Sequence, residues 1–297
     1  MQSFDENSTA LETDRPGKDA GNQLGRLLVD QGKIKEHDIE RILKYARKKQ
    51  LRFGEAATKL RLISRPDLEH AMATQFDYPY LEKGAGTFSR ELVAAFEPFS
   101  QKGQALRILR AQLMLRWYSE GHRTLAIVGS DPGEGCSYIA ANLAIVFSQL
   151  GQRTLLVDAD LQNGRQHKLF GLNNDVGLSA VLVGRTSFES VVKPLVLLRD
   201  LSIVPAGAPP PNPGELLGRK ELTDIIPELR QQYDVVIFDT PPVTANLGAE
   251  AVAGSCGSAL VVLRKNRTRL SSAGALMQQM HGTGAEVLVV GSVMNKF

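Results

Sequence analysis

The 297-residue sequence has few cysteines and no long hydrophobic run. Its two cysteines, Cys136 and Cys256, are too few and too far apart for a disulfide framework or a metal cluster, which fits a reducing compartment. The longest apolar stretches are strand-sized, far short of the roughly 20 residues that a bilayer span needs. The polar N-terminus lacks the apolar core of a secretory signal. These absences predict a cytoplasmic chain with no span of its own and no zinc module.

The amino-acid composition, with 43% hydrophobic and 23% charged residues, is typical of a soluble globular chain. The net charge of +3 is uneven, because residues 1–22 are acidic, 121–297 are neutral and 23–120 carry an excess of six positive charges. A basic run such as that at residues 47–49 is usually a solvated helix face, and an anion-binding surface is the alternative. We expect no nucleic-acid partner.

Residues 23–82 contain an internal repeat with a period of 29 residues. Hydrophobic residues recur at helical spacing, so each unit of the repeat predicts a helix, a turn and a second helix. The matched pairs include Gly25 with Gly54, Ile34 with Ile63, and Asp38 with Asp67. The sequence therefore predicts a small, duplicated helical module, preceded by a disordered tail over residues 1–22, which lack hydrophobic periodicity.

The remainder of the chain alternates between strand and helix patterns. Residues 83–120 read as a connector that ends in a helix over Gln104–Trp117. From there, apolar strands are expected at 124–130, 153–160, 201–206, 233–240, 257–264 and 285–295, with helical stretches between several of them. Continuous apolar strands indicate a sheet that is buried on both faces. Residues 121–297 are thus predicted to form a doubly wound α/β domain with a mostly parallel sheet.

A glycine-rich loop at residues 130–137 follows the first of these strands and precedes a helix. Glycines let backbone amides turn toward phosphate oxygens, and the helix N-terminus adds partial positive charge. A strict G-x-x-x-x-G-K-[ST] motif needs glycine at 130 and lysine at 136, whereas this chain has Ser130 and Cys136 and keeps Gly135 and Ser137. A tight turn without a ligand is the alternative for the loop taken alone.

Acidic residues end two other predicted strands. Asp158 and Asp160 close one strand, and Asp239 closes another. The carboxyl ends of parallel strands face the ligand crevice, so these carboxylates should converge on the loop. Carboxylate and hydroxyl oxygens are the ligands that Mg²⁺ prefers. The combination predicts a magnesium–nucleotide site with Ser137, Asp158 and Asp239 as metal ligands.

Residues 88–297 resemble the bacterial tyrosine kinases of exopolysaccharide chain-length systems, in particular the EpsG-type branch, which are related to MinD/ParA-like P-loop ATPases. The resemblance is carried by SDPGEGCSYIAANLA, LLVDADLQNGRQHKLFGL, GLSAVLVGR, VPAGAPPPNPGELLGR and VVIFDTPP. It implies ATP and Mg²⁺ as cofactors, with Asp158 and Asp160 as catalytic acids that help to deprotonate a tyrosine hydroxyl. The residues that it implies for nucleotide binding are Asp131, Pro132, Gly133, Glu134, Gly135, Cys136, Ser137, Tyr138 and Asn295.

Three features depart from that family. Cys136 stands where a lysine would place a positive charge on the β- and γ-phosphates, so transition-state stabilisation should suffer most. Gln162 stands where an arginine usually follows the second acidic motif. No tyrosine lies beyond Tyr233, so autophosphorylation of a tyrosine-rich tail is not expected. A weakened kinase and a nucleotide-binding regulator both remain open.

Two further resemblances concern the segment before residue 120. Gln104, Arg107 and Arg110 resemble the family's E-x-x-R-x-x-R oligomerisation motif and share one helix face, for which a solvated face is the alternative. The repeat resembles the N-terminal domain of type II secretion and pilus ATPases (MshEN-like), some of which bind cyclic di-GMP. That resemblance implies Arg52, Gly54 and Gln75 as binding residues, against a purely protein-docking module.

Three functions follow from these motifs. The leading prediction is an ATP-binding, tyrosine-kinase-like protein of exopolysaccharide synthesis that docks on a membrane-embedded chain-length determinant and thereby lies at the inner membrane. The second is a pseudokinase regulator that responds to nucleotide or cyclic di-GMP. The third is a MinD/ParA-type positioning ATPase, which is ranked last because Asp131 occupies the place of the early signature lysine.

Overall fold

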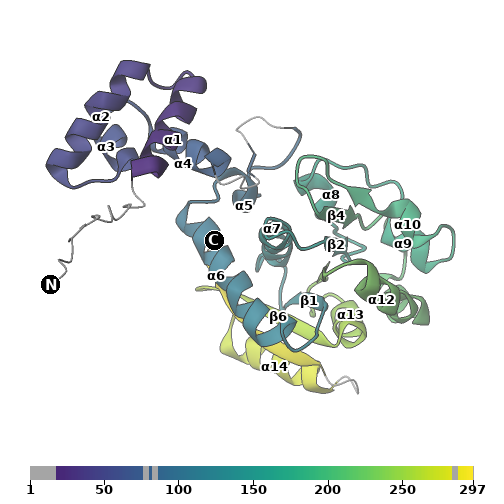
Figure 1. Cartoon of the computed structure of the whole chain (residues 1–297). Helices are drawn as coiled ribbons and strands as arrows, with labels where there is room; N and C mark the ends of the chain where they lie inside the picture. The colour runs from purple at the N-terminus through teal and green to yellow at the C-terminus, as the bar shows by residue number, and fades with distance from the viewer. Residues whose placement is uncertain (1–17, 76–79, 82–85, 283–286, 297) are drawn as a thin grey trace, which may run out of the picture. The chain divides into compact units, whose positions relative to one another are not determined.

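The structure is a computed structural model that describes residues 18–75, 80–81, 86–282 and 287–296. The chain divides into two compact units, Met1–Tyr78 and Pro79–Phe297. The boundary predicted from the sequence, after residue 82, lies slightly further along the chain. Figure 1 shows the course of the chain through both units.

The regular elements among the described residues of the N-terminal unit are all helices, joined by short turns. Its first helix starts at Lys18, inside the segment 1–22 that was predicted as a disordered tail, so that limit is wrong. The first turns of this helix have no hydrophobic periodicity, which is why the pattern did not reveal them; residues 1–17 lie outside the described residues. The helices are α1 (Lys18–Asp30), α2 (Glu36–Lys49), α3 (Phe53–Lys59) and α4 (Arg65–Gln75).

The repeat has equivalent caps at the start of α2 and α4. Asp38 Oδ2 accepts a hydrogen bond from the backbone N–H of Lys35 at 3.0 Å, and Asp67 Oδ2 accepts one from that of Ser64 at 3.0 Å. Lys33 Nζ also lies 2.7 Å from Asp67 Oδ1. Hydrogen bonds from Lys33 and Ser64 lower the pKa of Asp67 to about 2. The repeated aspartates therefore fix where the second helix of each unit begins.

The repeated glycines have a packing role. A Cβ atom on Gly25 would lie 3.2 Å from Phe53 Cζ, and one on Gly54 would lie 2.4 Å from Leu68 Cδ1. Both positions therefore allow neighbouring helices to approach closely. The core that results includes fully buried Leu28 and Ile42. Close helix packing is sufficient to explain why the glycine recurs in both units.

The C-terminal unit contains a seven-stranded sheet in the order β3-β4-β2-β5-β1-β6-β7. All neighbouring strands are parallel except β3, which pairs antiparallel with β4 at one edge. This confirms the predicted mostly parallel α/β fold; β3 was not predicted, because Lys193–Pro194 has no apolar pattern. The strands are β1 (Thr124–Gly129), β2 (Thr154–Asp158), β3 (Lys193–Pro194), β4 (Leu201–Val204), β5 (Val235–Asp239), β6 (Ser258–Arg264) and β7 (Leu288–Asn295).

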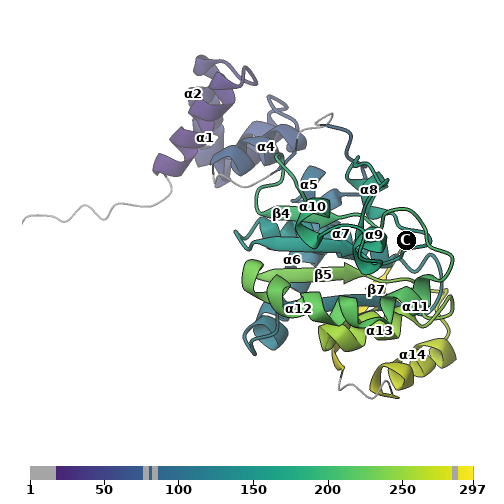
Figure 2. The ribbon, with the colours of Figure 1, turned by 90° about the vertical axis from the view of Figure 1, so that its right-hand side faces the viewer.

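Helices cover both faces of the sheet (Figures 1 and 2). Side chains alternate along each strand, so Ile127 and Ile237 pack into one core, whereas Val128 and Phe238 pack into the other. The first core is covered by α5 (Val93–Phe96), α6 (Gln101–Leu113), the π-helix η1 (Met114–Tyr118), α7 (Cys136–Ser148) and α8 (Gln166–Leu169). The second is covered by α9 (Leu178–Leu182), α10 (Phe188–Val191), α11 (Pro213–Leu217), α12 (Lys220–Gln232), α13 (Gly248–Cys256) and α14 (Leu270–Gly282).

The helix predicted over Gln104–Trp117 begins earlier and changes type. Its α-helical part is α6, and the chain then continues as η1, which carries Trp117. The indole Nε1 of this fully buried tryptophan donates a hydrogen bond to Ser258 Oγ at 2.8 Å, and Ser258 Oγ donates to the Thr124 carbonyl at 2.5 Å. The π-helical turn thus brings the tryptophan onto β6 and β1. Among the described residues, no helix combines the length and hydrophobicity that a bilayer crossing requires.

Candidate functional site

The predicted site residues meet at the carboxyl edge of three adjacent strands. β1 lies between β5 and β6, and β5 lies between β2 and β1. Asp158 and Asp239 are register partners at the ends of β2 and β5, and the loop at 130–135 continues directly from β1. The two buried cores hold these strands in place, so the sheet fixes the separation of loop and acids. This is the edge at which open α/β sheets bind ligands.

The loop curls at two glycines. Gly133 has φ 82° and Gly135 has φ 100°, left-handed conformations that side-chain-bearing residues rarely adopt. α7 begins immediately afterwards, at Cys136, so the free N–H groups of its first turn face the loop. Such an end of a helix attracts anions. The loop therefore retains the backbone features of a phosphate cradle.

Glu134 and Asn295 stabilise the loop through hydrogen bonds. Glu134 is 1% exposed, and its Oε2 accepts a hydrogen bond from the Ser130 N–H at 2.7 Å. Thr268 donates to the other oxygen of Glu134, and Asn295 Nδ2 donates to the Glu134 carbonyl at 2.9 Å. The Glu134 carboxylate thus helps to hold the loop in its conformation. Asn295, predicted to bind nucleotide, uses its side-chain N–H on the loop in this structure.

The remaining predicted loop residues differ in what they present to a ligand. Pro132 is exposed, whereas Asp131 is half-buried and accepts a hydrogen bond from Thr244 Oγ1 at 3.4 Å. Ser137 is half-buried, and its hydroxyl lowers the pKa of Asp239, which places it near that carboxylate. The Tyr138 ring lies in the first core, and burial raises the pKa of its hydroxyl to about 12. Only the backbone of Tyr138 can therefore face a nucleotide.

Asp158 and Asp239 are both fully buried. Asp158 Oδ2 accepts a hydrogen bond from the Gln166 backbone N–H at 2.9 Å, and Asp239 Oδ2 accepts one from Gln166 Nε2 at 2.8 Å. The Oδ1 atom of each carboxylate has no hydrogen-bond partner. Burial raises the pKa of Asp239 to about 7; burial and the neighbouring Asp239 charge raise the pKa of Asp158 well above its ordinary value.

These unpartnered oxygens fit a magnesium ion. A buried carboxylate oxygen without a partner is costly, and a cation would satisfy it. Mg²⁺ is usually held by one or two carboxylates together with water and phosphate oxygens, so Asp158, Asp239 and the Ser137 hydroxyl form a suitable donor set. In the described part of the chain, no cluster of three or more histidine, cysteine, aspartate or glutamate side chains offers a metal site built from protein alone.

Gln166 was missed by the sequence analysis. It is fully buried, contacts both acids, and also donates from Nε2 to the Ser137 carbonyl at 3.1 Å. The Gln166 backbone N–H therefore holds the end of β2, and its side chain joins the end of β5 to the first turn of α7. Its position eight residues after Asp158 does not indicate a role in the site. The contact forms only because the chain turns back toward the sheet between β2 and α8.

Asp160 differs from the two buried acids. It is half-buried, its Oδ1 accepts a hydrogen bond from the Asn163 N–H at 2.9 Å, and burial raises its pKa. A carboxylate that is partly accessible and whose pKa is raised is a better proton acceptor than an ordinary aspartate. Asp160 is therefore suited to the predicted catalytic role, whereas buried Asp158 is suited to binding a cation.

Cys136 brings no positive charge to the loop. Burial, together with the negative charges of Asp239 and Glu134, raises the pKa of its thiol well above the ordinary value. The side chain is therefore neutral at physiological pH. Its Sγ would lie 2.6 Å from a Cβ on Gly129, so the thiol packs closely against the end of β1.

The predicted oligomerisation residues make contacts within the chain. Arg107 donates to the Pro98 carbonyl, and Arg110 Nη1 donates to the Val146 carbonyl at 2.7 Å, which ties α6 to α7. Gln104 is exposed, and its Nε2 donates a hydrogen bond to the Phe99 carbonyl at 3.4 Å. These arginines therefore have a role in the fold of this unit, whatever they contact in an assembly.

The predicted cyclic di-GMP residues lie at the start of α3 and at the end of α4. Arg52 is exposed and immediately precedes α3, and Gln75 is the last residue of α4. Gly54 is buried against Leu68, where it serves the helix packing described above. Of the three, Arg52 is thus the residue that offers an accessible charged group to a ligand.

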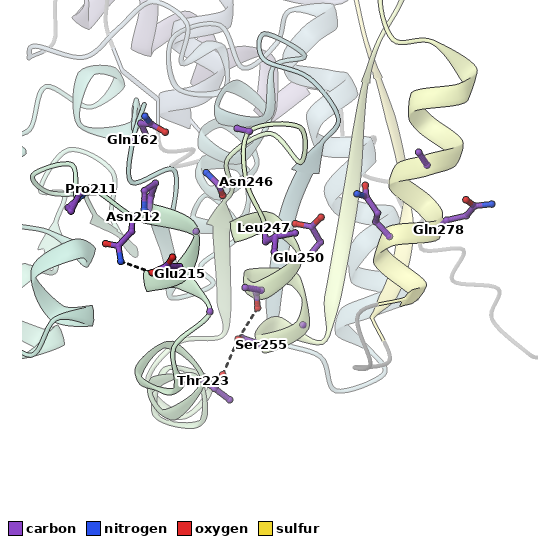
Figure 3. Close-up of a pocket in the computed structure, with 18 residues that line it drawn as sticks. Gln162, Pro211, Asn212, Glu215, Thr223, Asn246, Leu247, Glu250, Ser255 and Gln278 are labelled. Carbon is purple, nitrogen blue, oxygen red and sulfur yellow. Dashed lines mark hydrogen bonds between the residues drawn. The ribbon is translucent and has the colours of Figure 1, made fainter.

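An open groove of about 1700 Å³ is lined by residues of α11, α12, α13 and α14 (Figure 3). Gln162 and Asn246 lie at one end of it, and Thr223 and Ser255 lie at the other, with their hydroxyls 3.1 Å apart. Glu250 of α13 also lines it. The groove was not predicted, because it is formed between helices that are separated in sequence. Its upper end is continuous with the segment that follows Asp160.

Residues 122–283 match the family model described as an AAA domain. The chain is 33% identical to the tyrosine-protein kinase YwqD of Bacillus subtilis over 216 residues, which cover 72% of this chain and 90% of that protein. It is also 33% identical to the tyrosine-protein kinase wzc of Salmonella typhimurium over 197 residues, 66% of this chain. This chain spans only 27% of the length of the wzc kinase.

Solved structures agree with these relatives. The kinase domain of the Escherichia coli tyrosine kinase ETK superposes with a TM-score of 0.67 at 29% identity, over 74% of this chain and 85% of that one. MinD of Pyrococcus horikoshii, solved with Mg-ADP, shares the fold alone, with a TM-score of 0.50 at 23% identity over 59% of this chain and 71% of that one. The loop, the buried acid pair and these likenesses agree: the chain belongs to the family of bacterial tyrosine kinases with a P-loop α/β fold.

Proposed function

We propose that this chain is an ATP-binding, tyrosine-kinase-like protein of exopolysaccharide synthesis, which regulates polymer length or export and whose phosphoryl transfer is weakened by Cys136. The observation that carries the proposal is the buried pair Asp158 and Asp239, each with an unpartnered oxygen, beside a glycine-rich loop that opens a helix. This arrangement suits a magnesium–nucleotide and has no evident structural purpose of its own.

Each group in the site has a role in this proposal. Backbone N–H groups of the loop and of the first turn of α7 bind phosphate oxygens. Ser137, Asp158 and Asp239 would hold Mg²⁺, which, when bound, neutralises phosphate charge. Gln166 orients both acids, and Asp160 accepts the proton of the acceptor hydroxyl. Phosphoryl transfer depends mainly on positioning and charge, and this set supplies both except at Cys136.

Phosphotyrosine formation tests the proposed activity. The wild-type chain, incubated with Mg-ATP and a tyrosine-containing polymer, should form phosphotyrosine slowly, and Asp160→Asn should lower the rate by about 10²-fold, because it removes the proton acceptor. Glu189→Gln, which changes an exposed acid on α10, is the matched control and should leave the rate unchanged. Equal rates for Asp160→Asn and wild type would contradict the role of Asp160.

A nucleotide-gated regulator without kinase activity is the second candidate, and the neutral Cys136 thiol is the observation that favours it. It predicts saturable binding of Mg-ATP with no phosphotyrosine at any enzyme concentration. A MinD/ParA-type positioning ATPase is less well supported, since Asp131 takes the place of the signature lysine. ATP hydrolysis stimulated by anionic vesicles or DNA would favour that third function.

We infer a membrane-embedded chain-length determinant as partner, which would hold the chain at the inner membrane from its cytoplasmic side. The exposed apolar residues Ile108 (60% exposed) on α6 and Leu115 (76% exposed) on η1 support a homo-oligomer that uses this segment. Analytical ultracentrifugation of wild type and Leu115→Ser tests the oligomer. Identical, monomeric sedimentation of both would contradict it, and failure to co-purify with a co-expressed chain-length determinant would contradict the partner.

Cyclic di-GMP binding by the N-terminal unit is the remaining proposal. The support is the exposed Arg52 within the basic part of the chain, because an arginine can stack on guanine or pair with a phosphate. Arg52→Ala in the full chain should weaken binding by about tenfold or more, whereas Arg47→Ala, which removes an exposed charge from α2, should not. Wild type that binds no cyclic di-GMP would leave protein docking as the role of the unit.

A further inference from the structure

Two arginines lie over the phosphate loop. The heavy atoms nearest to the position of a Cβ on Gly133 are Arg267 Nη1, at 3.4 Å, and Arg264 Nη1, at 3.8 Å. Arg264 Nη1 also donates a hydrogen bond to the Gly133 carbonyl at 2.9 Å. The loop that lacks a lysine at position 136 is therefore contacted by two guanidinium groups from another part of the chain.

The segment after β6 is built to hold these arginines there. β6 pairs with β1, so its end emerges beside the loop. The Arg264 N–H donates to Thr268 Oγ1 at 2.8 Å, and the Thr268 N–H donates back to the Arg264 carbonyl at 3.0 Å, which closes a tight turn. Thr268 also donates to the buried Glu134 carboxylate. The turn that carries Arg267 is thus tied to the phosphate loop itself.

Arg267 brings a second positive charge to the point where Arg264 already contacts the loop. Both guanidinium groups lie within 4 Å of one point, an arrangement that an anion would stabilise. In the part of the chain that the structure describes, no ion pair involves Arg267. Its side chain is exposed, so it can turn its planar set of donors toward a ligand.

We propose that Arg267 is a phosphate-binding residue, which supplies the loop with the positive charge that Cys136 cannot. The ligand is a nucleoside triphosphate, so this inference rests on the proposed function. Arginine binds phosphate oxygens through two parallel N–H donors. The positive charge is thus supplied by the segment between β6 and α14, whereas a lysine at position 136 would supply it from the start of α7. Affinity for the polyphosphate is thereby retained, although the reacting phosphate still lacks its lysine.

The test is calorimetric titration of the full chain with Mg-ATP and Mg-ADP. Arg267→Gln should weaken ATP binding by about 10- to 100-fold with an unchanged melting temperature. Arg267→Lys should weaken ATP binding less than Arg267→Gln does. Arg269→Gln, which removes an exposed arginine from the same segment, is the matched control and should bind as wild type does.

The Cys136→Lys substitution decides whether charge is what Arg267 supplies. In the Arg267→Gln background it should restore ATP affinity to within a few-fold of wild type, whereas alone it should change affinity little. Two results would overturn the inference: Arg267→Gln that binds ATP as tightly as Arg269→Gln, or a loss that Cys136→Lys does not repair. Wild type that binds no ATP would instead refute the proposed function.

Discussion

Cys136→Lys should raise the rate of tyrosine phosphorylation by about 100-fold, with a much smaller effect on ATP affinity. The substitution places an ammonium group at the start of α7, beside buried Asp239 and Glu134, where the thiol is now neutral. A cation in that position stabilises charge that develops on the transferred phosphoryl group, and one such interaction changes rates by about 10²- to 10³-fold. The measurement is single-turnover phosphotyrosine formation at saturating Mg-ATP.

Cys136→Ser is the control for this substitution, since it keeps a small, neutral side chain and should leave the rate near that of wild type. If Cys136→Lys is no faster than Cys136→Ser, although both bind Mg-ATP, the missing lysine does not limit the reaction. The regulator function would then be favoured, because restoring the charge would not have restored the chemistry.

Asp239→Asn should stabilise the metal-free protein and abolish its stabilisation by Mg-ATP. Burial raises the pKa of Asp239 to about 7 from the ordinary 3.8, so the ionised carboxylate destabilises the fold. A group whose pKa is higher in the folded state contributes its full stability below pH 3.8 and loses it as the pH rises to about 7. The variant should therefore gain on the order of 2–4 kcal/mol at pH 8 in EDTA.

The measurement is urea denaturation of wild type and variant between pH 5 and pH 8, with and without Mg-ATP. Asp234→Asn is a control of opposite sign, because Arg153 lowers the pKa of Asp234 and the substitution should destabilise slightly at neutral pH. A variant less stable than wild type in EDTA at pH 8 would show that the buried carboxylate is structural rather than poised for a cation.

The sheet could be predicted because its strands are continuous apolar runs. Each of the six expected strands occurs in the structure, and buried runs such as Val235–Asp239 end at the acids that were assigned to the site. Gly133 and Gly135 likewise identified the loop, since only a sharply curled backbone needs glycine at both positions. The two-residue strand β3 and the π-helical turn could not be predicted from hydrophobic periodicity, because tertiary contacts determine their conformation.

The side chains that complete the site could not be predicted in the same way. Gln166 reaches Asp158 and Asp239 only because the chain returns to the sheet at α8. Arg264 and Arg267 lie 131 or more positions after Gly133 in the sequence, and the pairing of β6 with β1 brings them together. No local spacing encodes such contacts. Sequence motifs therefore located the strand-end residues, and the fold supplied their partners.

The central claim is that the loop and the buried acid pair form a magnesium–nucleotide site. It is tested most directly by calorimetric titration of the wild-type chain with ATP, in Mg²⁺ and again in EDTA. The account predicts saturable binding to a single site per chain in Mg²⁺ and a loss of about tenfold or more in EDTA, because the unpartnered oxygens of Asp158 and Asp239 would then repel the phosphates. A folded chain that binds no ATP in Mg²⁺, or binds equally well in EDTA, would contradict it.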